Sequence, residues 1–224
     1  MCGRFARKAT PAEIQSAFAV DVIKAELGPS YNIAPTQAVL AVVQNGSGRR
    51  GLVALKWGLI PHWSRDPGVA SKLINARAES AHEKPSFREA LRKRRCLIVA
   101  NGFYEWQKST KQPHYIHFED QPLFGFAGLY EFWQDPMNQR VETCTILTTQ
   151  ANQAIAPLHE RMPVVMAREH FGLWLDPKVS DPDALRPLLQ HHSATTTAFH
   201  PVSREINKVS YNQADALQPV SLDV

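Results

Sequence analysis

The chain has 224 residues, of which 44% are hydrophobic, and a formal net charge of +4. These values are typical of one globular domain of ordinary size and argue against a disordered chain. No apolar run approaches the roughly 20 residues of a membrane-spanning helix, and the first residues lack the layout of a signal peptide. We therefore expect a single domain over residues 1–224, in a monomeric cytoplasmic protein that does not enter a membrane.

The three cysteines fit a reducing compartment better than a disulfide framework. None belongs to a Cys-x-x-Cys pair, and the adjacent His191 and His192 have no flanking cysteines, so we expect neither a metal nor another cofactor. The mildly basic charge permits an acidic partner such as nucleic acid without demonstrating one. The basic stretch "FREALRKRRC", taken alone, is more typical of a solvated helix end.

In the first third of the chain, the pattern predicts a helix and then two strands. The stretch from Thr10 to Glu13 is a capping box with proline at the first helical position, and Gly28 and Pro29 are expected to end the helix. Apolar residues recur between them at helical spacing, at Ile14, Phe18 and Val22. The run "AVLAVVQNGSGRRGLVALKWG" then predicts two strands about an Asn-Gly turn.

The remainder predicts mostly strands. Residues 82–94 are expected to form a short helix that leads into one strand, "CLIVANGFYEW". Further strands are predicted at "PHYIHFED", "PLFGFAGLYEFW", "VETCTILTTQ" and "MPVVM", followed by helices at "AREHFGLWLD" and "DPDALRPLLQ". The fold class we expect is α+β, a single β-rich domain with antiparallel or mixed, barrel-like sheets and peripheral helices.

Several short stretches carry more polar groups than a strand core needs. In "LINARAES", Asn75, Arg77 and Glu79 share one face if the segment is extended, although this pattern alone favours a solvated edge. In "GFYEW", Glu105 follows an apolar strand, where burial would raise its carboxyl pKa and suit it to acid-base work; the alternative is that it faces solvent. His159 precedes another buried strand and is either a proton shuttle or a structural histidine.

Two loops combine proline with asparagine or tryptophan. "YNIAPTQ" contains Asn32, and "WGLIPHW" contains Trp57 and Trp63. Either tryptophan would be able to stack on unpaired bases if it is exposed, although tryptophan is more often buried packing. We expect Asn32 and Trp63 to contact DNA.

The order of these stretches is more specific than any one of them. "MCGRF", "YNIAPT", "WGLIPHW", "NARAES", "RCLIVANGFYEW", "HERMP" and "HPVSREIN" together resemble the SOS response-associated peptidase (SRAP) family of abasic-site processing proteins. The resemblance runs from Cys2 to about Asn212. It implies a compact β-rich domain with a positively charged groove, which recognises abasic sites in single-stranded DNA and links to them covalently through Cys2.

The resemblance also implies roles for individual residues. The nucleophile would be Cys2, and the polar groups of the active site would be Asn75, Glu105 and His159. The DNA backbone would be contacted by Arg4, Arg77 and Arg161. Two positions depart from the family pattern: Asn101 stands where aspartate is frequent, and Pro85 stands where a basic residue is frequent. The second departure puts one phosphate contact in question, for which Lys84 is the candidate substitute.

The chemistry of an abasic site explains why an N-terminal cysteine suits this role. Once Met1 is removed, Cys2 carries an α-amine and a thiol, which can form a Schiff base with the open-chain aldehyde and then a five-membered thiazolidine ring. An α-amine with a pKa of about 7.7–8.0 is partly neutral at physiological pH. We expect Glu105 to shuttle the amine proton, His159 to protonate the sugar oxygen and assist reversal, and Asn75 to hold the opened sugar. Strand-cleaving lyase activity would follow from the Schiff base.

Two alternatives remain open at this point. Cys2 and His159, with Asn75 as an oxyanion donor, would also suit a thiol peptidase, of which one form would remove its own Met1. A non-catalytic single-strand binder, for which Cys2 is incidental, is the third reading.

Overall fold

A computed structural model describes residues 2–222 of the chain. Five strands close into a mixed barrel in the order β11-β10-β7-β4-β5, in which neighbouring strands are antiparallel and one parallel pair, β5 with β11, closes the ring. The barrel strands are β4 (Ala38–Gln44), β5 (Arg50–Trp57), β7 (Arg95–Ala100), β10 (Phe124–Gln134) and β11 (Arg140–Gln150). Short strands extend it: β2 (Val22–Ile23), β6 (Asn75–Arg77), β12 (Arg161–Pro163) and β13 (Val165–Met166). The expected barrel-like α+β fold is confirmed.

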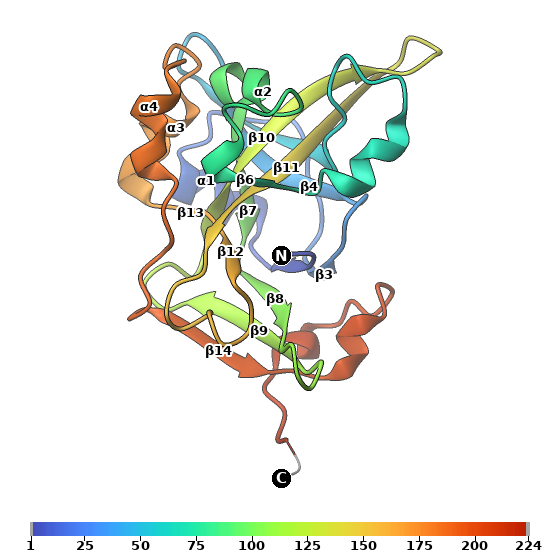
Figure 1. The fold of residues 1–224 in the computed structure, drawn as a ribbon, viewed down its shortest axis with the longest axis vertical. Coiled ribbons are helices and arrows are strands. Elements are labelled where there is room, and N and C mark those ends of the chain that lie inside the picture. Colours follow the sequence, from blue (N-terminus) through green and yellow to red (C-terminus); the bar gives the residue numbers. More distant parts are fainter. Residues whose placement is uncertain (1, 223–224) are drawn as a thin grey trace.

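A second sheet packs against one end of the barrel and lies below it in Figure 1. Its strand order is β14-β9-β8-β1-β3, and every pair in it is antiparallel. The strands are β1 (Phe5–Arg7), β3 (Ser30–Ile33), β8 (Gly102–Trp106), β9 (Pro113–Phe118) and β14 (Thr197–Pro201). The N-terminal end of the chain lies between barrel and sheet (Figure 1), so β1 brings the first residues to the junction of the two.

Short helices cover the outside of the barrel, with α3 and α4 together on its left flank in Figure 1. The α-helices are α1 (Pro11–Phe18), α2 (Arg88–Lys93), α3 (Phe171–Leu175) and α4 (Pro182–Leu185). Short 3₁₀ segments lie at Pro67–Lys72, Ala78–Ser80, Arg168–His170, Arg186–Leu188, Arg204–Asn207 and Ala214–Leu217. No helix within residues 2–222 has both the length and the apolar character needed to cross a bilayer.

Two apolar cores result. One lies between the helices and the outer face of the barrel, where Phe18 of α1 stacks on Phe171 of α3 with ring centroids 5.2 Å apart. The other fills the barrel and continues into the second sheet, because Phe5 of β1 contacts Trp57 and Phe126 of the barrel edge to edge. Cys2 is fully buried in this second core. The candidate nucleophile is therefore held by the core that fills the barrel.

Several expected elements are shorter than the sequence pattern predicts. The first helix has the predicted capping box, but it ends at Phe18 because Ala19 adopts a left-handed conformation (φ 50°), and Val22 belongs to a strand. The helix expected over residues 82–94 is confined to α2. The two helices expected near the C-terminal third are reduced to α3 and α4, each adjoined by a 3₁₀ turn.

The stretch "CLIVANGFYEW" is two strands of different sheets rather than one. The break is at Asn101, whose side-chain oxygen accepts hydrogen bonds from the backbone N–H groups of Lys8 and Ala9, while its amide donates to Pro122 O at 2.7 Å. "MPVVM" is likewise divided, since β12 pairs with β11 and β13 pairs with β10. The division at Asn101 is what carries Glu105 out of the barrel and into the sheet that also holds β1.

Candidate active site

The site is built around the backbone of β1. Tyr104 N donates to Arg4 O at 2.9 Å, and β1 pairs with β8 in the register Phe5 to Phe103. Extending this antiparallel register places Glu105 opposite Gly3, one residue from Cys2. Strand pairing therefore brings Cys2 and Glu105 together although 103 positions separate them in the sequence.

The thiol of Cys2 is buried and protonated. Its Sγ lies 3.7 Å from Arg4 O, which accepts a weak hydrogen bond from it. Burial raises the thiol pKa well above its usual range, and the negative charge of Glu105 raises it further. Two conclusions follow: the carboxyl group lies within electrostatic reach of the thiol, and the resting thiol is a neutral group that needs a base before it can react.

Burial also raises the pKa of the Glu105 carboxyl, whose residue is only 4% exposed. The expectation that Glu105 is buried and has a raised pKa is confirmed, and the alternative that its carboxylate faces solvent is wrong. A carboxyl group with a raised pKa exchanges protons more readily near neutral pH than an exposed one does.

Asn75 approaches Cys2 from the barrel. Its Nδ2 donates to the backbone oxygen of Cys2 at 2.8 Å, and its Oδ1 is buried without a hydrogen-bond partner among the described residues. β6 carries Asn75 alongside β11, in the parallel register Asn75 to Ile146. The amide therefore fixes the Cys2 backbone and leaves an acceptor oxygen at the site, a polar arrangement that a bound ligand donor would satisfy.

His159 lies on the loop that leads into β12, which pairs with β11 beside β6. Arg161 N donates to His159 Nδ1 at 2.9 Å, and the same ring nitrogen lies 3.2 Å from Arg161 O, so the backbone of Arg161 holds this edge of the imidazole. Burial lowers the pKa of the imidazole, and the positive charge of Lys108, on the turn after β8, lowers it further. Since Lys108 also pairs with Glu160 at 3.8 Å, the loop of His159 faces the hairpin that carries Glu105.

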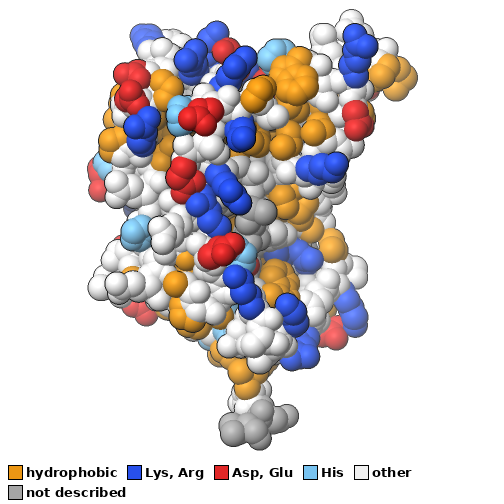
Figure 2. All heavy atoms as spheres, viewed as in Figure 1, with side chains coloured by type: hydrophobic (Ala, Val, Ile, Leu, Met, Phe, Trp, Pro, Cys, Tyr) orange, Lys and Arg blue, Asp and Glu red, His pale blue; other side chains and the backbone are white. Residues whose placement is uncertain are grey.

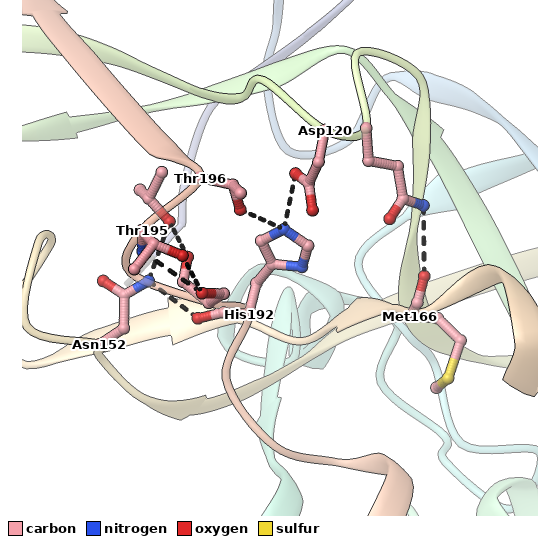
Figure 3. A network of polar contacts seen from close by, with 9 residues as sticks. Asp120, Asn152, Met166, His192, Thr195 and Thr196 are labelled. Carbon is pink, nitrogen blue, oxygen red and sulfur yellow. Dashed lines mark hydrogen bonds and ion pairs between the residues drawn. The ribbon is translucent and has the colours of Figure 1, made fainter.

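A polar network anchors the other end of this loop (Figure 3). Asn152 Nδ2 donates to His192 O at 2.9 Å and to Thr197 Oγ1 at 3.0 Å, while its Oδ1 accepts from Ile155 N. His192 Nε2 in turn lies 3.1 Å from Asp120 Oδ1. Nothing in the sequence pattern signals Asn152, because this side chain ties its own loop to the distant segment that contains His192 and Thr197.

Three arginines were expected to contact the DNA backbone, and the structure gives them different surroundings. Arg77 is exposed at the end of β6. Arg4 donates from Nη1 to Asn32 Oδ1 at 2.6 Å and to Ile206 O at 2.8 Å, and its guanidinium lies 6.0 Å from the ring centroid of Trp106. Arg161 binds Glu79 through both of its terminal nitrogens.

The two loop residues expected to contact DNA, Asn32 and Trp63, differ in exposure. Asn32 is buried, and its Nδ2 contacts the carbonyls of Ile206, Lys208 and Tyr211, so it anchors the C-terminal segment and holds Arg4. Trp63 is 56% exposed and free to stack on a base. The alternative, Trp57, is excluded, because it is fully buried and donates to Ile74 O.

The segment "NARAES" is extended only from Asn75 to Arg77, after which a 3₁₀ turn re-aims Glu79 toward Arg161. The expectation that all three polar residues share one face of a strand is wrong for Glu79. Of the two departures from the family pattern, Asn101 is buried and caps backbone N–H groups, whereas Pro85 and Lys84 are exposed.

Lys and Arg side chains border the waist of the molecule on the face shown in Figure 2, with acidic side chains among them. The basic stretch expected to be a solvated helix end is only partly so. Arg95 is buried and donates to Leu91 O and Arg92 O at the C-terminus of α2, and Arg94 pairs with the buried Glu131 at 2.8 Å. Among the described residues, no cluster of three or more histidine, cysteine or acidic side chains is arranged to hold a metal ion.

Comparison with known proteins identifies the family of this chain and several of its relatives. Residues 1–209 match the family described as "SOS response associated peptidase (SRAP)". The chain is 42% identical to the abasic site processing protein YoqW of Bacillus subtilis, over 97% of this chain and 99% of that one. It is 31% identical to the abasic site processing protein HMCES of Gallus gallus, over 88% of this chain and 68% of that one. A crystal structure of a protein from Bacteroides thetaiotaomicron superposes with a TM-score of 0.88 at 26% identity, covering 98% of this chain and all of the other.

Proposed function

Since the chain belongs to the SOS response associated peptidase (SRAP) family, we propose that it recognises abasic sites in single-stranded DNA and becomes covalently linked to them through Cys2, after Met1 has been removed. The relatives named as abasic site processing proteins support this proposal. The observation that carries it is the convergence of Asn75 and Glu105 on Cys2, a residue that would present an amine and a thiol together.

The link forms in two steps that balance without a cofactor. The neutral α-amine of Cys2 adds to the C1′ aldehyde of the opened sugar, and loss of water gives a Schiff base. The Cys2 sulfur then adds to the same carbon, and the thiol proton ends on the nitrogen, which closes a thiazolidine ring. Because both nucleophiles belong to one residue, ring closure is intramolecular and benefits from a high effective concentration.

Glu105 moves protons in both steps. Its carboxylate accepts a proton from the α-ammonium group before the first step, which leaves the neutral amine, and the resulting acid protonates the hydroxyl that leaves as water. The neutral thiol then needs a base, and the same carboxyl group lies within electrostatic reach of the sulfur. The raised pKa of Glu105 keeps both protonation states accessible near neutral pH.

His159 and Asn75 act on the sugar. The His159 Nε2–H donates to the ring oxygen of the closed sugar and so favours opening to the aldehyde, which is the reactive form. The buried Oδ1 of Asn75 accepts a hydrogen bond from a hydroxyl of the opened sugar. The Schiff base also permits β-elimination of the 3′ phosphate, so we include a slow lyase activity in the proposal.

A thiol peptidase is the less favoured reading of the same residues. Peptide hydrolysis needs a thiolate, which enzymes obtain by lowering the pKa of the cysteine. Here burial and the charge of Glu105 both raise the pKa of the Cys2 thiol. This environment suits a thiol that adds to an imine after the amine has reacted, and it disfavours a first attack by sulfur on a peptide bond.

Binding before the chemistry would use the exposed Trp63 and the three arginines around the site. Trp63 would stack on an unpaired base, and Arg4, Arg77 and Arg161 would contact phosphates, with Asn32 acting by holding Arg4. We propose a monomer of one domain that acts in the cytoplasm on exposed single strands. Its affinity would fall steeply with salt, because phosphate contacts release counterions.

A denaturing gel with an abasic oligonucleotide tests the proposal. The wild-type chain should give a heat-stable shifted band, and Cys2→Ala should give none. Cys144→Ala is the matched control, since that cysteine is also buried and unpaired but lies inside the barrel. A band that persists in Cys2→Ala would overturn the mechanism, and cleavage of an added peptide without any band would favour the peptidase.

The N-terminus provides an independent test. Intact mass should show that Met1 is absent from the active protein, and a variant that retains residues ahead of Cys2 should not crosslink. Normal crosslinking by such an extended protein would exclude the aminothiol mechanism. It would not bear on the proposal that the protein binds single-stranded DNA.

A further inference from the structure

The pair formed by Glu79 and Arg161 lies beside the site and has no role in the chemistry above. The two terminal nitrogens of Arg161 each bind one carboxylate oxygen of Glu79 at 2.8 Å. Such a two-point contact is the geometry in which a guanidinium also binds a phosphate group. The Glu79 carboxylate thus occupies the two N–H donors of Arg161 that a DNA phosphate would use.

The two partners differ in how firmly they are held. The Arg161 side chain is 17% exposed, and its Nη2 also donates to Thr148 O at 2.5 Å, so the guanidinium keeps its place without Glu79. The Glu79 side chain is 54% exposed and belongs to a single 3₁₀ turn after β6. An incoming anion would therefore displace the carboxylate and leave the arginine where it is.

The charges around the pair also set Glu79 in competition with DNA phosphate. The hydrogen bond from Arg161 lowers the pKa of Glu79, and the positive charges of Arg161 and Arg77 lower it further, so the carboxylate is ionised at neutral pH. The Glu79 carboxylate thus lies close to both Arg161 and Arg77, the two arginines at this edge of the site that are proposed to contact DNA. The pair is not needed for folding energy, since exposed ion pairs contribute about 0–1 kcal/mol.

We propose that Glu79 competes with DNA phosphate for Arg161 and thereby keeps non-covalent binding of single strands weak. The inference rests on the proposed function and adds to it. A protein that is retained by a covalent bond gains nothing from tight binding to undamaged strands, and weak binding lets it leave them. The exchange of carboxylate for phosphate sets the affinity of this step.

Anisotropy with a labelled, undamaged single-stranded oligonucleotide tests the proposal in a Cys2→Ala background, where no crosslink forms. Glu79→Gln should bind about fivefold more tightly, as expected for release of an exposed ion pair worth up to about 1 kcal/mol. Glu83→Gln is the matched control, because it removes an exposed carboxylate four residues away that pairs with His82, and it should change affinity less than twofold.

A double-mutant cycle separates the direct competition from a general effect of charge. When Arg161 is already replaced by Gln, or by the equally neutral Met if that variant is unstable, Glu79→Gln should no longer tighten binding. A gain that persists in both backgrounds overturns the proposal, as does a Glu79→Gln protein that binds equally or more weakly. The proposed function fails separately, if the wild-type chain gives no band with an aldehydic abasic strand.

Discussion

The three buried thiols make the stability of the protein sensitive to alkaline pH. Cys2, Cys96 and Cys144 are each fully buried, and burial raises the pKa of each thiol well above its usual range. The unfolded chain releases these protons near pH 8.5 while the folded chain keeps them, so the stabilisation is complete below that pH and is lost as pH rises above it. Between pH 8.0 and 9.5 each thiol should lower the free energy of unfolding by about 1.3 kcal/mol, and the three together should lower it by about 4 kcal/mol.

Urea unfolding of the reduced protein at several pH values between 8.0 and 9.5 measures this loss. In Cys2→Ala the decrease should be about two thirds of the wild-type value, because one of the three thiols is gone. The α-amine is retained in that variant, so the difference reports the thiol alone. Equal slopes for the two proteins would refute the reasoning, since they would mean that Cys2 ionises as easily in the folded chain as in the unfolded one.

Three further predictions concern single side chains. Asn32→Ala should lower the free energy of unfolding by about 4 kcal/mol in urea unfolding, because it removes two neutral hydrogen bonds and one to a guanidinium. The control Asn207→Ala, at an exposed position, should unfold near the wild-type urea concentration. An equal loss of stability in both variants would contradict the anchoring role of Asn32. Trp63→Ala should weaken single-strand binding about tenfold in anisotropy if one base stacks on the indole, and unchanged affinity would remove Trp63 from the interface. His159→Ala should slow crosslink formation or reversal on gels with an unchanged melting temperature, and unaltered kinetics would exclude a role in proton transfer.

The sequence predicted the strands and the polar residues of the site better than it predicted where elements end. The hairpin of β4 and β5 has the expected Asn-Gly turn, and the capping box at Thr10 is present. The helix after that box is short because Ala19 leaves the helical conformation and Val22 pairs with Gly51 of β5. A tertiary strand pairing of this kind overrides helical spacing, and nothing in the local pattern announces it.

The same limit applies to the site. Motif order brought Cys2 and Glu105 into one hypothesis, but their proximity depends on the break at Asn101, where β7 leaves the barrel and β8 enters the second sheet. Burial of Asn32 was also hidden, because its partners are backbone carbonyls of the C-terminal segment. A backbone carbonyl has no residue identity, so contacts to it leave no trace in the sequence.

The surroundings of Cys2 bear on which of its two nucleophiles acts first. A thiolate would react faster than an amine in solution, but here burial and Glu105 hold the sulfur in its protonated form. In the proposed mechanism the amine therefore forms the Schiff base before sulfur takes part. Once the imine exists, its carbon is one ring closure away from the sulfur, and Glu105 is placed to accept the proton. In this proposal a protonated thiol in the resting protein is compatible with the second step, because proximity supplies what ionisation does not.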